Sequence, residues 1–532
     1  TECYLTGILR KRVSFITCVE EEIAGNEKQD ARNILLLKAE ASNEIIIDYY
    51  SERGFLVKET IGSISRVKDI IRPIYLIVMF LKAIFINERI KTNLNRVRDA
   101  IWIEYDDGVD SFVDTSFWRG YVHKEAWDIV FYLDRADTPC NDETIKRIET
   151  KGYLWVDFHD PISIISLSDF SLNDLKRSIE KAISKMGPLW LRLFWLQYLL
   201  MLAAYGVSFE MFKVRMIVQN RDTSWMQEIQ RQAIESAGGI MVGTHWSNYP
   251  CVMSPSHLFP HHVFFVWGKI IRDVIMLGRN ACDYILPCGL WINADSSAVE
   301  ELKELKTKVT FGISLFDSSF AYNIHLTPRS LSEFYLRIID IIEKKGSWGA
   351  VVKSKNSNIK NLSSLPNGGE IVDRLEALQN SGRVLILNSG VSPLTISEYT
   401  DLSLCFGLNS AGIVVGAEGA RAIHWDCSGW TKHPIYKDKT QKIMYRTLDE
   451  FEQAIISASE GDVSIGDFAK WKKEYNYYCD KKAGKRLGDY VNDYMEMVIK
   501  TDDPKGSLRE TVKRYILKNS VDNRFSMEMN NW

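Results

Sequence analysis

The chain has 532 residues, of which 46% are hydrophobic, and is long enough to form two large domains with buried cores. Its 66 Lys and Arg nearly balance its 69 Asp and Glu, and the resulting net charge of −3 argues against a protein that coats nucleic acid. Nine scattered cysteines without metal-ligand spacing, and no visible signal peptide, lead us to expect a cytoplasmic protein.

Short apolar runs alternate with helical stretches through the first half of the chain. Helices are expected at 44–53, 63–92 and 224–236. Strands are expected at 33–39, 55–58, 101–105, 127–133, 153–158, 213–218, 240–243, 263–267 and 284–286. Buried strands separated by helices are typical of a mostly parallel sheet, so the pattern predicts an α/β fold.

Two apolar stretches, 70–86 and 188–205, need to be weighed as membrane segments. Each is shorter than, or interrupted within, the roughly 20 apolar residues that a spanning helix requires. We therefore expect buried or interfacial helices, with peripheral contact at the inner face of the plasma membrane as the form of any membrane association.

A second α/β series begins at Lys308. Its expected strands are 309–315, 350–353, 384–387, 402–406 and 422–425, and its expected helices lie near 330–345, 370–380 and 450–459. The segment 293–306 is predicted to be a hinge. The chain then divides into an N-terminal domain (1–292), a C-terminal domain (307–466) and a helical tail (467–532), with loose order expected beyond Lys500.

The most informative segment is 399–434, where a buried strand ends in a polar turn that opens onto an apolar helix. The turn contains Gly407, Asn409, Ser410 and Gly412, and the helix is expected to break at Gly419. A helix N-terminus presents unpaired backbone N–H groups that attract phosphate, and ligands of parallel sheets bind at the carboxyl ends of the strands. An ordinary helix cap is the alternative interpretation, because Asn and Ser cap helices.

The order and spacing of several segments resemble the GT-B glycosyltransferases, as they occur in bacterial capsule and O-antigen biosynthesis. The likeness covers roughly residues 210–460. It is carried by VQNRDTSWMQEIQRQAIESAGGIMVGTHWSNYP, FFVWGKIIRDVIMLGRNACDYILPCGLW, TFGISLFDSS, VVKSKN and TDLSLCFGLNSAGIVVGAEGARAIHWD. Thr244-His245-Trp246 stands where such enzymes carry Gln-His-Gly. The resemblance implies two Rossmann-type domains facing each other across a cleft.

The resemblance also implies a reaction: transfer of a sugar from a nucleotide-sugar donor, with CMP-linked donors among the candidates. The acceptor would be a growing surface polysaccharide or a lipid-linked glycan. The nucleotide-sugar is a substrate, and no cofactor is expected. Metal independence is expected because the sequence has no Asp-x-Asp, HExxH or Walker motif.

Sugar transfer leaves negative charge on the departing phosphate, so fixed donors are needed there. Lys353 and Lys355 are candidate point charges, although a solvated loop would look the same. The remaining donor-binding candidates are Ser314 and Asp317 at the end of the first strand of this half, Asn409, Ser410 and Gly412 in the turn, and Glu418 and His424 for the ribose or base.

The acceptor hydroxyl must lose a proton, which calls for a base from the first half. His245, at a predicted strand end, has an ordinary pKa near working pH. Asp106 and Asp107 are the second candidates, since Tyr-Asp-Asp-Gly also resembles the acidic motif of bacterial sialyltransferases, which use CMP-sugars. His433-Pro434 resembles the His-Pro motif of those enzymes but stands elsewhere, after the last expected strand.

Two other functions fit the same residues. A polyol-phosphate transferase of the teichoic-acid type would use the same fold and phosphate turn. A non-catalytic sugar-nucleotide binding protein would bind the donor without turnover. Neither alternative requires a nucleic-acid partner.

Overall fold

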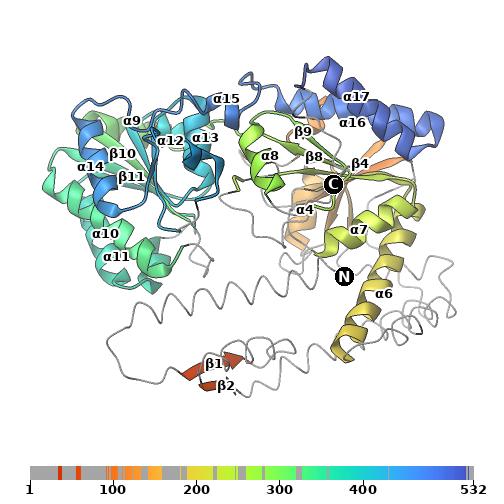
Figure 1. Ribbon diagram of the computed structural model, residues 1–532, viewed down its shortest axis with the longest axis horizontal. Coiled ribbons are helices and arrows are strands. Elements are labelled where there is room, and N and C mark those ends of the chain that lie inside the picture. Colours follow the sequence, from red (N-terminus) through yellow and green to blue (C-terminus); the bar gives the residue numbers. More distant parts are fainter. Residues whose placement is uncertain are drawn as a thin grey trace.

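The computed structural model describes most of the chain from residue 98 onward. The residues it leaves out are 1–33, 39–55, 61–91, 93, 95–97, 106–108, 110, 112–113, 115, 124, 134–141, 158–179, 181–188, 220–224, 246, 250–258, 278–281, 319–325, 356–358, 429–430, 523–524 and 526–532. The described residues form two α/β units, which Figure 1 shows side by side.

The first unit is built on seven parallel strands in the order β5-β4-β3-β6-β7-β8-β9. The strands are β3 (Ala100–Glu104), β4 (Asp128–Leu133), β5 (Leu154–Asp157), β6 (Val214–Gln219), β7 (Ile240–Thr244), β8 (Val263–Val266) and β9 (Tyr284–Pro287). The helices between these strands are η1 (Arg119–Tyr121), α4 (Asp142–Thr150), α6 (Leu189–Met211), α7 (Trp225–Ser236) and α8 (Lys269–Met276). The strands are almost entirely buried, which explains their near-continuous apolar runs.

The second unit is built on six parallel strands in the order β12-β11-β10-β13-β14-β15. The strands are β10 (Phe311–Phe316), β11 (Trp348–Lys353), β12 (Val384–Leu387), β13 (Leu402–Phe406), β14 (Ala422–Trp425) and β15 (Met444–Tyr445). The helices are α9 (Val299–Lys308), α10 (Pro328–Lys344), η3 (Ile359–Ser364), α11 (Gly368–Asn380), α12 (Pro393–Ser397), α13 (Ser410–Glu418), η4 (Pro434–Lys437) and α14 (Leu448–Ser459). The predicted strands of this half are confirmed; β15, only two residues long, was not predicted.

Both sheets share one winding pattern. Counted along the chain, each runs 3-2-1-4-5-6, and the first sheet adds a seventh strand. The order reverses between β3 and β6 in one sheet and between β10 and β13 in the other. These are topological switch points, where open parallel sheets bind ligands beyond the carboxyl ends of their strands. The predicted α/β class with two doubly wound sheets is confirmed.

Two expectations need correction. The parallel strands β1 (Ile34–Lys38) and β2 (Leu56–Thr60) pair with each other in a separate two-stranded sheet and do not join the seven-stranded one. The expected loose order beyond Lys500 is wrong for residues 504–518, which form helix α17. The segment 293–306 is helical from Val299 onward, and its role as a hinge stays a prediction.

The C-terminal segment returns to the first unit. It contains α15 (Lys472–Tyr475), α16 (Ala483–Thr501) and α17 (Pro504–Lys518), and Figure 1 shows α15 between the two units and α16 and α17 over the first. The Tyr515 hydroxyl donates to the carbonyl of Pro287 at 2.7 Å, and the Tyr490 ring lies 5.1 Å from that of Phe265. The tail is therefore part of the core of the first unit.

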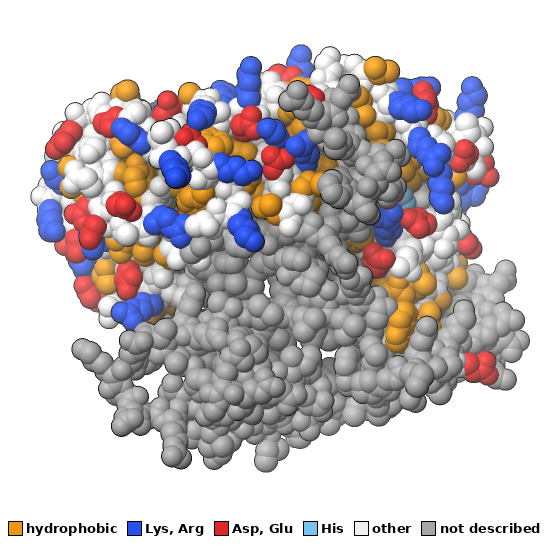
Figure 2. Space-filling view, in the orientation of Figure 1, with side chains coloured by type: hydrophobic (Ala, Val, Ile, Leu, Met, Phe, Trp, Pro, Cys, Tyr) orange, Lys and Arg blue, Asp and Glu red, His pale blue; other side chains and the backbone are white. Residues whose placement is uncertain are grey.

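The helices and the charged surface bear on contact with membranes and nucleic acid. None of the helices in the described part of the chain is long and apolar enough to span a bilayer; the stretch 70–86 lies outside that part. Figure 2 shows acidic and basic side chains interspersed over the described surface on this face. That mixture agrees with the near-neutral net charge.

Candidate functional site

The switch point of the second sheet brings two predicted segments together. The carboxyl end of β10 lies between the end of β11, which carries Lys353, and the end of β13, which leads into α13. The Asn409 side-chain amide donates to the carbonyl of Phe316 at 2.7 Å and so ties the start of α13 to the end of β10. Two strand spacings place the ends of β11 and β13 about 10 Å apart.

The N-terminus of α13 has the predicted cap. The Asn409 side chain accepts from the N–H of Gly412 at 3.0 Å, and the helix ends at Gly419, which has a left-handed φ of 104°. Because Gly412 donates internally, its N–H is occupied. In the described part of the chain no acceptor faces the N–H groups of Ser410 and Ala411, both of which are partly exposed. These two amides are the ones available to an anion.

Asp317 organises the turn after β11. Its carboxylate accepts from the Tyr335 hydroxyl and the Ser354 hydroxyl, each at 2.9 Å, and from the N–H of Lys355 at 2.6 Å. Burial raises the pKa of Asp317, and these three hydrogen bonds oppose that rise. With both oxygens engaged, Asp317 fixes the lysine turn in place. The direct contact between Asp317 and the donor that the sequence predicts stays a prediction, and this geometry weighs against it.

The two lysines differ in exposure. Lys353 is partly buried, and that burial lowers the pKa of its ammonium group to about 8, although Asp317 and Asp295 act to raise it. Lys355 is exposed, and desolvation also lowers its pKa. A partly desolvated lysine interacts more strongly with an arriving phosphate than a fully solvated one does.

Ser314 and His424 lie deeper than expected. The Ser314 hydroxyl is 2.8 Å from that of Ser403 within the sheet, and the residue is fully buried. The His424 ring is also fully buried, its Nδ1 lies 2.9 Å from the carbonyl of Gly407, and burial lowers its pKa to about 4. His424 therefore supports the turn from beneath. This burial weighs against the predicted contact of His424 with ribose or base and against the predicted contact of Ser314 with the donor.

Gly412 is explained by packing. A Cβ there would lie 2.3 Å from the Cys405 Sγ and 2.8 Å from the His424 Nε2, both buried. The second unit therefore requires glycine at this position even without a phosphate. The predicted direct phosphate contact through its N–H is not favoured.

Glu418 occupies the wrong end of α13 for a donor contact. The helix has nine residues, so Glu418 lies about 12 Å from the capped end. Its carboxylate accepts from the Asn476 side chain at 3.0 Å, and Asn476 in turn accepts from the N–H of Leu290. Glu418 thus helps to fasten the second unit to the first.

His245 lies at the end of β7 as predicted, but both ring nitrogens are engaged. Nε2 accepts from the N–H of Trp267 at 2.9 Å, and Nδ1 lies 2.8 Å from the carbonyl of Ser247. Burial lowers its pKa to about 3. The role of base stays a prediction, and this geometry weighs against it because neither nitrogen has a lone pair available.

Asp106, Asp107 and His433 are the remaining residues that the sequence singles out for catalysis. Asp106 and Asp107 directly follow β3 in sequence but lie outside the described residues. His433 is buried and caps η4, accepting from the N–H of Ile435. It precedes β15, so it does not follow the last strand of the sheet.

A contact between the units was not anticipated from the sequence. The backbone N–H of Asn248, four residues after β7, donates to the Ser410 hydroxyl at 2.9 Å, and its side-chain amide donates to the carbonyl of Leu408 at 3.1 Å. The segment containing Asn248 carries part of the resemblance, but nothing in the residue pattern pairs positions 162 residues apart.

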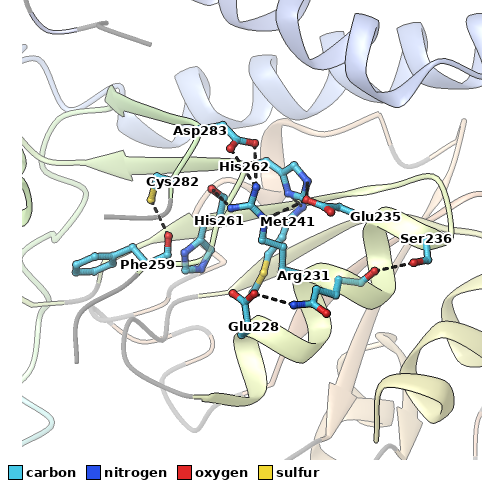
Figure 3. Close-up of polar contacts among 11 residues, drawn as sticks. Glu228, Arg231, Glu235, Ser236, Met241, Phe259, His261, His262, Cys282 and Asp283 are labelled. Atoms are coloured by element: carbon cyan, nitrogen blue, oxygen red, sulfur yellow. Dashed lines mark hydrogen bonds and ion pairs between the residues drawn. The ribbon is translucent and has the colours of Figure 1, made fainter. Parts of the chain in front are cut away.

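A second polar cluster lies at the amino edge of the first sheet, where strands β8 and β9 begin (Figure 3). Arg231 of α7 donates to both carboxylate oxygens of Asp283, at 3.0 and 3.2 Å, and to Glu235 at 3.0 Å. Glu235 also pairs with His262, which lowers the pKa of that carboxyl to about 2. These bonds join α7 to the starts of β8 and β9, so the cluster fastens the fold on the side away from the switch point.

Among the described residues, no group of three or more His, Cys, Asp or Glu side chains is placed to hold a metal ion.

No family model and no curated protein matches the chain. Solved structures that overlap it loosely include a glycosyltransferase from Rickettsia africae (10% identity, 80% of this chain and 100% of that one, TM-score 0.38). The glycotransferase of kitacinnamycin gives 11% identity, 75% and 99% coverage and a TM-score of 0.42. Sucrose-phosphate synthase from Thermosynechococcus elongatus gives 12% identity, 75% and 100% coverage and a TM-score of 0.41.

Proposed function

We propose that the protein is a glycosyltransferase that binds the phosphate of a nucleotide-sugar donor at the carboxyl edge of its second sheet. One observation carries the proposal. At the switch point between β10 and β13, the N-terminus of α13 offers two amides on one side, and a lysine pair held by Asp317 lies on the other. Amides and ammonium groups on either side of one strand end suit the charge that develops on a departing nucleotide phosphate.

The finer terms of the proposal come from the sequence. We take the donor to be a nucleotide-sugar, with a CMP-linked sugar as the first to test. The acceptor would be a growing surface glycan or its lipid-linked form, with peripheral contact at the membrane. Transfer would not depend on a metal, because the lysines and amides supply the positive field. Asp106 and Asp107, which follow β3, are the proposed base.

The test is a donor assay. The purified protein is incubated with CMP-, UDP- and GDP-linked sugars and with CDP-glycerol, in EDTA and in Mg²⁺, and the released products are identified. Released sugar supports the proposal. CMP released from CDP-glycerol would instead support a polyol-phosphate transferase, and binding without turnover would support a binding protein.

Two variants connect the assay to the site. Lys353→Ala is expected to weaken donor binding by roughly tenfold or more, since a charge-assisted bond to phosphate is lost. Lys308→Ala is the matched control, because that lysine lies at the end of α9, just before β10 and so at the opposite edge of the same sheet. Equal binding by the two variants would refute the placement of the donor.

A further inference from the structure

The bonds that Asn248 makes across the two units are directed at the turn that begins α13. Its backbone N–H donates to the Ser410 Oγ and its Nδ2 donates to the carbonyl of Leu408. The two acceptors lie on either side of Asn409, the cap residue. Asn248 is buried, with only 4% of its surface exposed, and its bond to Leu408 is shielded from water, whereas the bond to the partly exposed Ser410 is only partly buried. One residue of the first unit therefore holds the turn on both sides of its cap.

The orientation of the Asn248 amide is fixed by its partner. A backbone carbonyl only accepts hydrogen bonds, so the atom that faces Leu408 must be the nitrogen. Its other atom, Oδ1, is buried and has no hydrogen-bond partner among the residues that the structure describes. A buried acceptor without a partner is unfavourable, so the hydrogen bonds that Asn248 does make must offset that cost.

The bond to Ser410 also determines what that hydroxyl can do. Because Oγ accepts from the N–H of Asn248, the hydroxyl hydrogen must point in another direction. It is then available, with the amides of Ser410 and Ala411, to an anion at the helix N-terminus. If the bond is lost, the hydroxyl can rotate and accept from its own helix, as serine side chains do near helix starts.

We infer that Asn248 is a positioning residue of the donor site: it reaches across from the first unit and sets the turn and the Ser410 hydroxyl for a phosphate-bearing nucleotide. This inference rests on the proposed function and deepens it. Nucleotide affinity then depends on a residue of the acceptor-side unit that itself touches no phosphate. Contact between the units and donor binding are linked through this one turn.

The experiment measures the affinity for CMP, UDP and GDP by titration calorimetry, with melting temperature as the check on folding. Asn248→Asp keeps the size of the side chain but places a carboxylate oxygen against the carbonyl of Leu408. We expect it to weaken the affinity of the nucleotide that the wild-type protein binds best by roughly tenfold. Asn248→Ala tests the same bond without a new charge and should weaken binding severalfold.

The matched control is Asn492→Asp. Asn492 is equally buried, at 5% exposure, and its Nδ2 likewise donates to a backbone carbonyl, that of Tyr121, while its Oδ1 accepts from the N–H of His123. These bonds join α16 to the segment 121–123, and both lie within the first unit. Asn492→Asp should therefore lower the melting temperature as Asn248→Asp does, and leave nucleotide affinity unchanged.

A double-mutant cycle separates positioning from general damage. Ser410→Ala should weaken binding, and Ser410→Thr should restore most of it. Adding Asn248→Ala to Ser410→Ala should cost less than Asn248→Ala costs alone, because the Asn248 side chain holds the turn that places the Ser410 hydroxyl, and that hydroxyl is already absent. Nucleotide affinity unchanged in both Asn248 variants would overturn the inference and leave the proposed function standing. If the wild-type protein bound none of the three nucleotides, the proposed function would fail and this inference with it.

Discussion

The charge of Lys353 should make nucleotide binding and stability respond to pH in opposite directions. Its pKa is lowered to about 8, chiefly by burial. The group is then about 90% charged at pH 7 and about 10% charged at pH 9, from the ordinary titration relation. If only the ammonium form pairs with phosphate, the nucleotide dissociation constant should rise roughly tenfold between these two pH values.

The stability effect has the other sign. The folded-state pKa of Lys353 lies below the unfolded value of about 10.4, so the unfolded chain binds more protons between pH 8 and pH 10. The free energy of unfolding should therefore rise with pH through that window. The difference between these two pKa values sets an upper bound of about 3 kcal/mol on the change in the free energy of unfolding, and partial exposure of the side chain reduces it.

Calorimetric titration of the nucleotide at half-unit steps from pH 6.5 to 9.5, beside urea unfolding at the same pH values, measures both effects. Lys353→Arg is the informative variant, because a guanidinium stays charged throughout this range. Its binding curve should be flat where the wild-type curve falls, and the rise in its stability should be smaller. A wild-type affinity that does not change between pH 7 and pH 9 would show that Lys353 does not pair with the phosphate.

Three further substitutions test the site. Gly412→Ala places a methyl group 2.3 Å from the Cys405 Sγ and should destabilise the protein by about 1–3 kcal/mol in urea unfolding. Gly369→Ala is the control: it has open space around it in α11 and should be neutral or stabilising. Equal stability of the two variants would contradict the packing argument. Asp317→Asn keeps the shape of the side chain but replaces one accepting oxygen by an NH₂ group, which cannot accept from the three donors that now bond to the carboxylate. We expect a loss of about 1–3 kcal/mol of stability together with weaker nucleotide binding. An unchanged affinity would show that the lysine turn does not need this carboxylate. His245→Ala should lower the melting temperature but reduce the transfer rate less than tenfold, and a loss of a hundredfold or more in a folded variant would restore it as the base.

The strand positions were predictable because the apolar residues within each strand determine them. The runs 402–406 and 422–425 are apolar enough to be buried on both faces of a parallel sheet, and the structure has fully buried strands at these same positions. The cap at Asn409 is equally local, since its side chain bonds to an amide three residues ahead. Signals that lie within a few residues of one another can be found in one sequence.

The expectations that the structure corrects or weighs against share the opposite property. Tyr515 gives α17 a place in the core through a carbonyl 228 residues earlier, so a charged tail beyond Lys500 shows no local sign of order. His245 is an inviting base until the N–H of Trp267 occupies its Nε2. Ser314 resembles a strand-end ligand until the neighbouring strand supplies Ser403. In each case burial by a distant segment decides the role, and residue type alone cannot indicate it.

Helix α13 combines a locally determined cap with contacts made by segments distant in the sequence. Its residues 412–417 are all buried, and an apolar helix without a polar face must be enclosed by protein on every side. Its far end is fastened to the first unit through Glu418 and Asn476, and its near end through Ser410 and Asn248. A rotation of the units about the far attachment would move the near end, about 12 Å away, relative to Asn248. The amides that we propose to bind phosphate are therefore at the end of α13 that is most sensitive to how the two units meet.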